Sequence, residues 1–139
     1  MIKPSRFSII VTCYNFAEYL PECLDSVLGQ NYAKADYEVI CVDDGSTDQT
    51  PEIIRRYQSE TSHLKSVRIN NSGLEKACNG GIKRSKFDRI VRVDADDVLD
   101  AAFLAKMNDA IIREPQYDFY YCKEYVEYYS AFEKFHKVL

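Results

Sequence analysis

The sequence lacks several features, and each absence excludes a class of protein. No apolar run approaches the ~20 residues needed to cross a bilayer, and residues 1–6 contain no hydrophobic region of a signal peptide. The five cysteines are an odd number without a Cys-x-x-Cys pair, so we expect them to be reduced and mostly buried. Lys and Arg number 18 against 22 Asp and Glu, so the chain lacks the basic excess of a general nucleic-acid-binding protein. These absences predict a cytoplasmic protein that does not bind nucleic acid.

Three common active-site motifs are also missing. The loop after the first apolar stretch has no Gly-x-Gly-x-x-Gly fingerprint for a dinucleotide, and the chain has no Gly-x-x-x-x-Gly-Lys-[Ser/Thr] phosphate loop. A Gly-x-Ser-x-Gly nucleophile elbow is absent as well. The two histidines, His63 and His136, lie far apart in polar or mixed surroundings, so we expect them at the surface rather than in a zinc site.

Apolar stretches alternate with amphipathic ones along the chain. Short β-branched runs bounded by polar residues predict strands, and apolar residues at intervals of three and four predict helices between them. We expect strands at residues 7–12, 37–42, 66–70, 88–93 and 117–122, and helices at 17–29, 51–58, 74–85, 103–114 and 128–137. This order predicts a single α/β domain over residues 1–139, with a mostly parallel central sheet and helices on both faces.

Three carboxylates, Asp94, Asp96 and Asp97, follow the strand expected at 88–93. Ligands of open α/β sheets bind at the carboxyl ends of the strands, and carboxylates crowded there repel one another unless a cation or a proton relieves the charge. The pattern therefore favours a divalent metal site. The alternative is a helix N-terminus with solvated acids, in which Asp97 or Asp100 caps the following helix.

Polar segments follow three other expected strands, and together with the acidic segment they predict one shared crevice. These segments are Thr12-Cys13-Tyr14-Asn15, Asp43-Asp44-Gly45-Ser46 and Asn70-Asn71-Ser72-Gly73. The helix after the third segment contains the pair Gly80-Gly81, and glycines inside a helix cost about 1 kcal/mol each against alanine. We therefore expect another backbone or a ligand to approach this pair closely.

The polar segments carry a family resemblance. The stretches concerned are Ile10-Val11-Thr12-Cys13-Tyr14-Asn15, Val42-Asp43-Asp44-Gly45-Ser46-Thr47-Asp48, Asn71-Ser72-Gly73-Leu74 and Asp94-Ala95-Asp96-Asp97. In order and spacing they resemble the nucleotide-sugar half of family 2 glycosyltransferases with the GT-A fold, over about residues 7–103. The resemblance implies a Rossmann-like GT-A domain that binds a nucleoside-diphosphate sugar, most often a UDP-sugar, with Mg²⁺ or Mn²⁺. It also implies inverting transfer of the sugar to an acceptor hydroxyl, as in polysaccharide biosynthesis.

The resemblance implies a set of site residues as well. Asp94 and Asp96 match the two acids of the family's Asp-x-Asp signature and are expected to hold the metal, Asp96 most directly. The expected nucleotide-sugar contacts are Thr12, Tyr14, Asn15, Asp43, Asp44, Lys76, Asp94, Ala95 and Asp96. Alternative roles are open for three of them: a Tyr14 that bridges the sheet and the first helix, an Asp43 that holds its own loop, and a solvated Lys76.

The chain departs from the family pattern in two places. Cys78 stands where the family commonly has an arginine, so a cationic contact to the diphosphate is either missing or supplied by Lys76. The family's catalytic base is an acidic residue well downstream of the Asp-x-Asp signature, and no motif marks Glu124, Glu127 or Glu133 as that base. We therefore interpret the chain as a donor-binding domain that lacks the acceptor-binding C-terminal part.

The expected partners are a nucleotide sugar and a glycan or lipid-linked acceptor. The second implies peripheral association with the inner face of a membrane. A non-catalytic nucleotide-binding or protein-interaction module derived from such an enzyme is the alternative function. Tyr and Phe are dense between residues 117 and 135, and their exposure would favour this alternative and a homo-oligomer formed through the C-terminal aromatic segment.

Overall fold

The computed structural model describes residues 3–120 of the chain. In chain order its elements are β1 (Phe7–Cys13), α1 (Leu20–Leu28), the 3₁₀ helix η1 (Lys34–Asp36), β2 (Tyr37–Asp43), α2 (Thr50–Glu60), β3 (Leu64–Arg68), α3 (Leu74–Ile82), β4 (Arg89–Asp94) and α4 (Phe103–Arg113). Strands and helices alternate as predicted. No helix in this part of the chain has both the length and the apolar character needed to cross a membrane.

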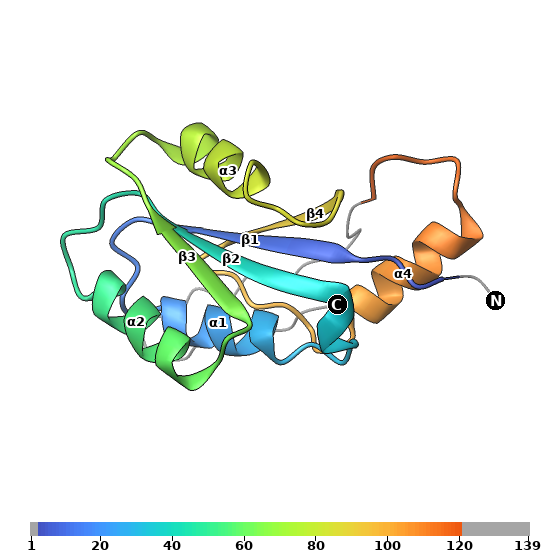
Figure 1. Cartoon of the computed structure of the whole chain (residues 1–139), viewed down its shortest axis with the longest axis horizontal. Coiled ribbons are helices and arrows are strands. Elements are labelled where there is room, and N and C mark those ends of the chain that lie inside the picture. Colours follow the sequence, from blue (N-terminus) through green and yellow to red (C-terminus); the bar gives the residue numbers. More distant parts are fainter. Residues whose placement is uncertain (1–2, 121–139) are drawn as a thin grey trace, which may run out of the picture.

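The four strands form one parallel sheet in the order β3-β2-β1-β4 (Figure 1). β1 and β2 lie at its centre, and every residue of both is buried. Central strands of a parallel sheet are covered on both faces, which explains why these two segments are largely apolar along their whole length. β3 and β4 lie at the two sides, and each has only one buried residue. The predicted α/β class with a parallel sheet is confirmed.

Helices cover both faces of the sheet, as Figure 1 shows for α3 on one side and α1 and α2 on the other. Ile9 and Val39 point into the larger core, which contains buried residues of α1, α2 and α4. Ile10 and Ile40, their neighbours in sequence, point to the opposite face and pack with Ala77 of α3. Alternate residues of a strand face opposite ways, so one apolar run supplies both cores.

The glycine pair of α3 combines one close contact with one open position. A Cβ at Gly81 would lie 2.5 Å from Ile10 Cγ2, so glycine lets α3 approach β1 closely. A Cβ at Gly80 would meet only Arg84 Nη1, at 3.9 Å. The expected close approach therefore exists at Gly81, where the neighbour is a side chain of the sheet, and not at Gly80.

α1 begins at Leu20, three residues later than expected. The Phe16 N–H donates to Thr50 Oγ1 and the Ala17 N–H to Asp48 Oδ2, each at 3.1 Å. These bonds tie the segment before α1 to the loop after β2 and to the first residue of α2, and they hold the segment as a turn. The local apolar pattern does not reveal this, because the partners lie more than 30 residues away.

The strand expected at residues 117–122 is wrong for the part that the structure describes. Residues 117–120 have no regular structure. The Tyr117 N–H and the Tyr120 hydroxyl both donate to the Glu114 carbonyl, at 3.3 Å and 2.5 Å. The chain therefore turns back onto the end of α4 here and does not add to the sheet. The helix expected at 128–137 lies outside the described residues.

The expected cysteine chemistry is confirmed for the described residues, and His63 lies only partly at the surface. The four described cysteines are free. Cys13, Cys23 and Cys41 are buried, and Cys78 is partly buried. His63 is only partly exposed, its Nε2 is buried, and its ring packs edge-on against Tyr37 with centroids 4.5 Å apart. Cys122 and His136 lie outside the described residues.

Candidate functional site

The carboxyl ends of the four strands lie at one edge of the sheet, because all the strands are parallel (Figure 1). The loops that follow them are joined by backbone hydrogen bonds. The Asp44 N–H donates to the Cys13 carbonyl, and the Ile69 N–H donates to the Asp43 carbonyl, both at 2.9 Å. This edge is where open α/β sheets bind ligands, and it brings together the four predicted polar segments.

Thr12 and Asp94 are neighbours across the pairing of β1 with β4. They face each other in the parallel register, and Thr12 Oγ1 lies 3.4 Å from Asp94 Oδ1. The same carboxylate oxygen accepts a hydrogen bond of 2.5 Å from Arg92 Nη2. Thr12 is buried, whereas the side chains of Arg92 and Asp94 are 46% and 40% exposed. Asp94 is therefore accessible to a ligand, but an arginine of its own strand compensates its charge.

The residues after Asp94 form a tight turn. The Asp97 N–H donates to the Asp94 carbonyl at 2.9 Å, Ala95 is fully buried, and Asp96 and Asp97 are exposed. Partial burial, and then the negative charges of Asp96 and Asp94, raise the pKa of the Asp97 carboxyl. The carboxylates thus repel one another at the end of β4, as the sequence predicts.

Neither Asp97 nor Asp100 occupies the N-cap position of α4. That position belongs to Ala102, which has no side-chain capping bond. Asp100 Oδ1 accepts the Ala102 N–H at 3.0 Å and the Lys106 ammonium at 3.2 Å, and these two contacts lower the pKa of Asp100. Asp100 stabilises the turn before α4, and helix capping does not explain the acids at the end of β4.

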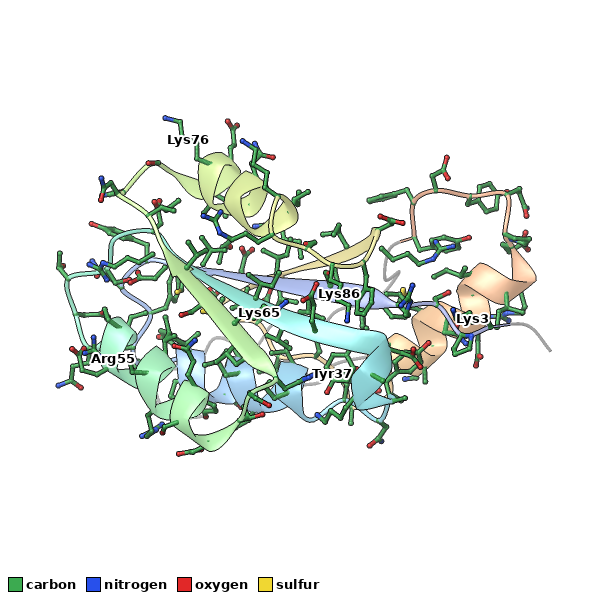
Figure 2. All side chains as sticks on the ribbon, in the orientation of Figure 1. Lys3, Tyr37, Arg55, Lys65, Lys76 and Lys86 are labelled. Carbon is green, nitrogen blue, oxygen red and sulfur yellow. The ribbon has the colours of Figure 1, made fainter. Side chains whose placement is uncertain are left out.

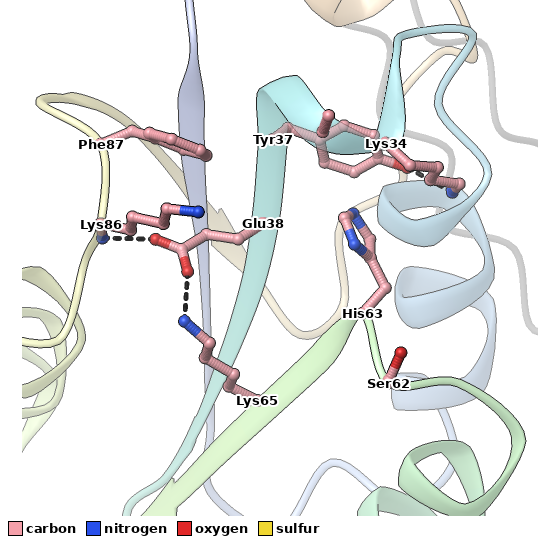
Figure 3. A pocket seen from close by; sticks show the side chains of 9 residues that line it. Lys34, Tyr37, Glu38, Ser62, His63, Lys65, Lys86 and Phe87 are labelled. Atoms are coloured by element: carbon pink, nitrogen blue, oxygen red, sulfur yellow. Dashed lines mark hydrogen bonds and ion pairs between the residues drawn. The ribbon is translucent and has the colours of Figure 1, made fainter.

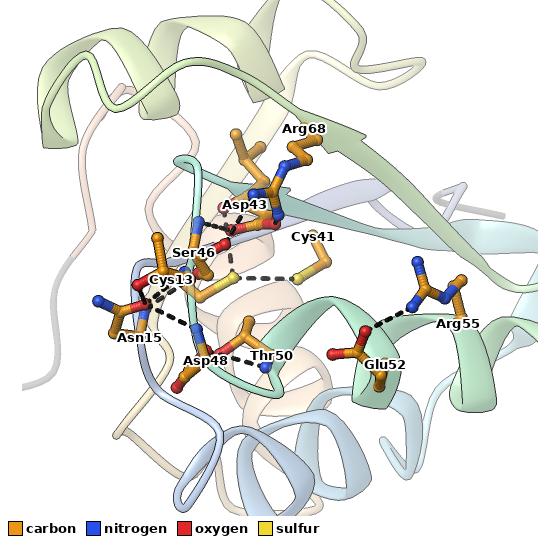
Figure 4. A network of polar contacts seen from close by, with 12 residues as sticks. Cys13, Asn15, Cys41, Asp43, Ser46, Asp48, Thr50, Glu52, Arg55 and Arg68 are labelled. Atoms are coloured by element: carbon orange, nitrogen blue, oxygen red, sulfur yellow. Dashed lines mark hydrogen bonds and ion pairs between the residues drawn. The ribbon is translucent and has the colours of Figure 1, made fainter.

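Asp43 holds the loop that follows β2 (Figure 4). Its carboxylate is buried and accepts the Ser46 N–H at 2.8 Å and a hydrogen bond from Arg68 Nη1. Arg68 Nη2 in turn donates to the Ser46 carbonyl at 2.6 Å. The geometry therefore agrees with the loop-holding alternative for Asp43, and both of its oxygens already have donors from the protein.

Asp44 joins the β2–α2 loop to the β3–α3 loop. Its buried carboxylate accepts the Ser72 N–H at 2.6 Å and the Gly73 N–H at 2.8 Å, one on each oxygen. Gly45 is required where the loops meet, because its φ is +82° and a Cβ there would lie 2.8 Å from the Asn71 nitrogen. Unlike Asp43, Asp44 forms no ion pair within residues 3–120.

Asn15 ties the loop after β1 to the loop after β2 (Figure 4). Its φ is +58°, its N–H donates to Ser46 Oγ at 2.9 Å, and its Oδ1 accepts the Thr47 N–H at 2.8 Å and the Asp48 N–H at 3.3 Å. Tyr14, one residue earlier, is 40% exposed. Asn15 thus shapes the site through the backbone, while the Tyr14 ring is accessible at the edge of the sheet.

The cation beside Cys78 comes from β4. Burial alone would lower the pKa of Arg92, but its contacts with Asp94 and Cys78 raise it. Lys76 is exposed, and Figure 2 shows its side chain on the outer side of α3, away from the sheet. The guanidinium of Arg92 therefore lies next to Cys78 and Asp94. The sequence alone predicts only Lys76 as a source of positive charge here.

Sequence reasoning misses Arg68 and Arg92, although strand geometry contains a signal for both. Arg68 lies opposite Asp43 in the register of β2 with β3. Arg92 precedes Asp94 by two residues, which puts both side chains on the same face of β4. An arginine two residues before an acid at the end of a strand therefore indicates that the protein itself neutralises that acid. An arginine at the end of a neighbouring strand indicates the same.

The acidic turn fits a metal ion that arrives together with a phosphate ligand. Within the described residues, no group of three acidic, histidine or cysteine side chains converges to hold an ion alone. Mg²⁺ is commonly bound by one or two carboxylates plus the phosphate oxygens of a substrate, and Mn²⁺ also prefers oxygen ligands. Asp94 and Asp96 offer such oxygens on an accessible turn.

Known proteins share this sequence pattern. A profile of the family described as Glycosyl transferase family 2 matches residues 8–137. The chain is 35% identical over 103 residues to the poly(ribitol-phosphate) beta-glucosyltransferase of Bacillus spizizenii, an alignment that covers 73% of this chain and 16% of the relative. It is 34% identical over 96 residues to the poly(ribitol-phosphate) beta-N-acetylglucosaminyltransferase TarS of Staphylococcus aureus, covering 68% of this chain and 17% of TarS.

Solved structures share the fold. The crystal structure of S. aureus TarS 1–349 in complex with UDP-GlcNAc superposes with a TM-score of 0.72 and 33% identity, over 79% of this chain and 32% of that one. The mannosyltransferase PcManGT from Pyrobaculum calidifontis, in complex with GDP-Man and Mn²⁺, gives 0.69 and 30% over 78% of this chain and 34% of that one. The chain thus spans about a third or less of the length of these relatives. On profile, sequence and fold alike, the chain belongs to glycosyl transferase family 2 and has the GT-A fold.

Proposed function

We propose that the chain is the donor-binding part of a glycosyltransferase. It binds a nucleoside-diphosphate sugar with Mg²⁺ or Mn²⁺, for inverting transfer of the sugar to an acceptor hydroxyl. The observation that carries the proposal is that Asp44, from the end of β2, and Asp94, from the end of β4, lie at one sheet edge on either side of Thr12. Relatives in complex with UDP-GlcNAc and GDP-Man support a nucleotide sugar as the ligand. The proposed donor is a UDP-sugar.

Thr12, Tyr14 and Asp44 are the proposed contacts to the nucleoside. The exposed ring of Tyr14 can stack on the base or meet its edge. Each oxygen of Asp44 has one backbone donor and therefore keeps a lone pair that can accept the imide proton of uracil. Asn15 and Asp43 contribute by holding the loops that present these groups, which reduces the entropy lost when the donor binds.

Asp94 and Asp96 are the proposed ligands of the metal ion. The ion would neutralise the negative charge that develops on the leaving diphosphate. Arg92 places a further positive charge beside Asp94. Lys76, in the first turn of α3, adds another only if its side chain turns from the outer side of the helix toward the site. Ala95 has no exposed surface, so its proposed contribution is to shape the turn that presents Asp94 and Asp96.

The acceptor side of the reaction is proposed to lie outside residues 3–120. A catalytic base must come within hydrogen-bond reach of the acceptor hydroxyl. The proposed acceptor is a glycan or a lipid-linked molecule, and the proposed location is the cytoplasm, in peripheral association with the inner face of a membrane. Relatives named poly(ribitol-phosphate) glycosyltransferases are consistent with a polymeric acceptor.

A non-catalytic nucleotide-binding or interaction module is the second candidate. Tyr117 and Phe119, after α4, are 57% and 80% exposed. Exposed aromatic groups often mark surfaces that bind another protein. A second copy of the chain is the proposed partner for this surface.

Calorimetry with UDP and UDP-sugars tests the proposal. The chain should bind UDP in the presence of Mn²⁺ and much more weakly in EDTA, and Asp96→Ala should abolish the metal-dependent part. Asp88→Ala is the matched control, because Asp88 is an exposed acid just before β4, at the other end of the strand.

The outcome separates the two candidates. Absence of binding to any nucleotide would refute the donor domain and the nucleotide-binding form of the module, and would leave only an interaction module. Metal-dependent binding together with sugar transfer by this chain would identify an enzyme that needs no further part. Binding without transfer until the missing part is supplied supports a donor domain, and binding that never leads to transfer supports the module.

A further inference from the structure

A pocket of about 190 Å³ lies at the amino ends of β2 and β3 (Figure 3). The lining residues that matter here are Lys34, Tyr37, Glu38, His63, Lys65 and Lys86. β2 runs from Tyr37 at this pocket to Asp43 at the proposed donor site, a distance of about 20 Å for a strand of this length. The pocket is therefore separate from the residues proposed to bind the nucleotide.

The carboxylate in the pocket, Glu38, is already satisfied. It is buried and accepts hydrogen bonds from Ser8 Oγ at 2.7 Å, Lys65 Nζ at 2.6 Å and the Lys86 N–H at 2.5 Å. Burial alone would raise the pKa of Glu38, but the contacts with Lys65, the Lys86 N–H and Ser8 lower it. Glu38 is thus ionised at neutral pH and neutralises one of the three lysines.

The other two ammonium groups have no carboxylate partner. Lys34 Nζ donates to the Tyr37 hydroxyl at 2.5 Å and to the Leu28 carbonyl. Lys86 Nζ lies 5.3 Å from the centre of the Phe87 ring. Within residues 3–120 neither lysine forms an ion pair. The pocket is therefore positively charged, although the chain as a whole has a net charge of −4.

A neighbouring arginine adds to this charge, and a histidine adds an unsatisfied polar atom. Burial, and then the charge of Lys34, lower the pKa of His63, so its ring is not a source of positive charge. The guanidinium of Arg6 lies 4.8 Å from the centre of the same Phe87 ring that Lys86 contacts. The Nε2 of His63 is buried without a hydrogen-bond partner among the described residues. Buried polar atoms in proteins nearly always have a partner. Because Nε2 is enclosed by the protein, a ligand oxygen reaches it only if the His63 ring turns toward the pocket.

We propose that this pocket binds a phosphate group, with the unpaired Lys86 as its main contact, Lys65 as a further donor whose charge Glu38 already neutralises, and Lys34 as a further source of positive charge. A phosphate fits better than a carboxylate because its oxygens can meet ammonium groups from different elements at once, and because it carries up to two negative charges. Pockets for larger ligands usually enclose about 300–1,000 Å³, so this one suits a phosphate group and the atoms next to it, but not a nucleotide. The inference does not depend on the proposed donor site.

NMR titration of the ¹⁵N-labelled chain with inorganic phosphate tests the inference, with chloride at equal ionic strength as the reference. Phosphate should produce saturable shifts of the amide signals of His63, Lys65 and Lys86, with a dissociation constant in the millimolar range. Lys86→Gln should weaken binding at least fivefold. This variant keeps the backbone N–H that holds Glu38, so the fold should be retained.

Lys83→Gln is the matched control, because Lys83 is an exposed lysine just after α3 and does not line the pocket. Shifts that do not saturate, or equal weakening by Lys83→Gln and Lys86→Gln, would overturn the inference. Lys86→Glu provides a second test, since reversal of the charge should abolish binding in a protein whose remaining amide spectrum is unchanged.

The phosphate can belong to a soluble molecule or to a lipid headgroup, and sedimentation with vesicles distinguishes them. If the source is a lipid, vesicles containing phosphatidylglycerol should retain the chain, phosphatidylcholine vesicles should not, and Lys86→Gln should lose the retention. If the source is soluble, glycerol phosphate should bind at least as well as inorganic phosphate, and neither kind of vesicle should retain the chain. Failure of phosphate, glycerol phosphate and phosphatidylglycerol alike would overturn the inference.

Discussion

Arg92→Gln should increase the affinity of the acidic turn for Mn²⁺. Arg92 Nη2 donates to Asp94 Oδ1 at 2.5 Å, so an ion that binds this oxygen must compete with the arginine. Glutamine keeps a polar side chain and removes the charge. The two side chains are 46% and 40% exposed, and ion pairs at such positions contribute about 0.2–1 kcal/mol. Removal of the pair should therefore tighten Mn²⁺ binding by up to about fivefold.

The EPR signal of free Mn²⁺, followed as wild-type or variant protein is added at a fixed concentration of UDP, compares this affinity between the two proteins. The difference between the proteins should shrink at high salt, because exposed charges are then screened. Arg55→Gln is the control, since it removes a comparable exposed pair on α2, between Arg55 Nη2 and Glu52 Oε1 at 2.7 Å. If Arg92→Gln bound Mn²⁺ no more tightly than the wild type, the competition between Arg92 and the ion would be refuted.

Two further predictions concern stability. Gly81→Ala should lower the free energy of unfolding by about 1–3 kcal/mol, because the new Cβ would lie 2.5 Å from Ile10 Cγ2. Gly80→Ala should raise it by up to about 1 kcal/mol, because that position is open; equal effects in urea denaturation would contradict the packing of α3 on β1. Glu38→Gln should destabilise the protein at neutral pH, and the difference from the wild type should shrink as the pH falls. The pKa of Glu38 is lower in the folded protein than its ordinary value of 4.5, so its contribution is complete above 4.5 and is lost as the pH falls through the folded value. A difference that persists unchanged down to about pH 3 would contradict this linkage.

The parts of the fold that depend on local pattern could be predicted from the sequence. β1 and β2 are continuous β-branched runs because both faces are buried, and their predicted bounds are correct to one residue at the C-terminal end. β3 begins at Leu64, two residues earlier than the sequence predicts. Leu64 packs in the core, but the polar residues Ser62 and His63 precede it, so the local pattern does not mark it as the start of a strand. The apolar pattern thus predicts the bounds of a fully buried central strand better than those of a partly exposed outer strand.

Most polar contacts of the site depend on partners far apart in the sequence and cannot be predicted from it. The exception is the contact of Asp43 with its own loop, which the sequence offers as an alternative. Acids at the strand ends are visible as a motif, but the sequence does not tell which of them the protein itself satisfies. Asp43 and Asp44 are adjacent and chemically identical, yet one is paired with Arg68 and the other with two backbone N–H groups. Only the register of the strands decides between these roles.

β4 carries Asp94, although it is one of the least protected strands that the structure describes. Among the described strands it pairs with β1 alone, only one of its six residues is buried, and Thr12 and Asp94 are 82 positions apart in the sequence. Pairings over such separations are slow to form, and weakly buried segments open locally before the whole protein unfolds. The amide protons of β4 should therefore exchange with solvent earlier than those of β1 and β2. A donor that contacts both Asp44 and Asp94 would bind to β4 and to the end of β2 at once. It would therefore slow this exchange and stabilise the pairing of β4 with the rest of the sheet.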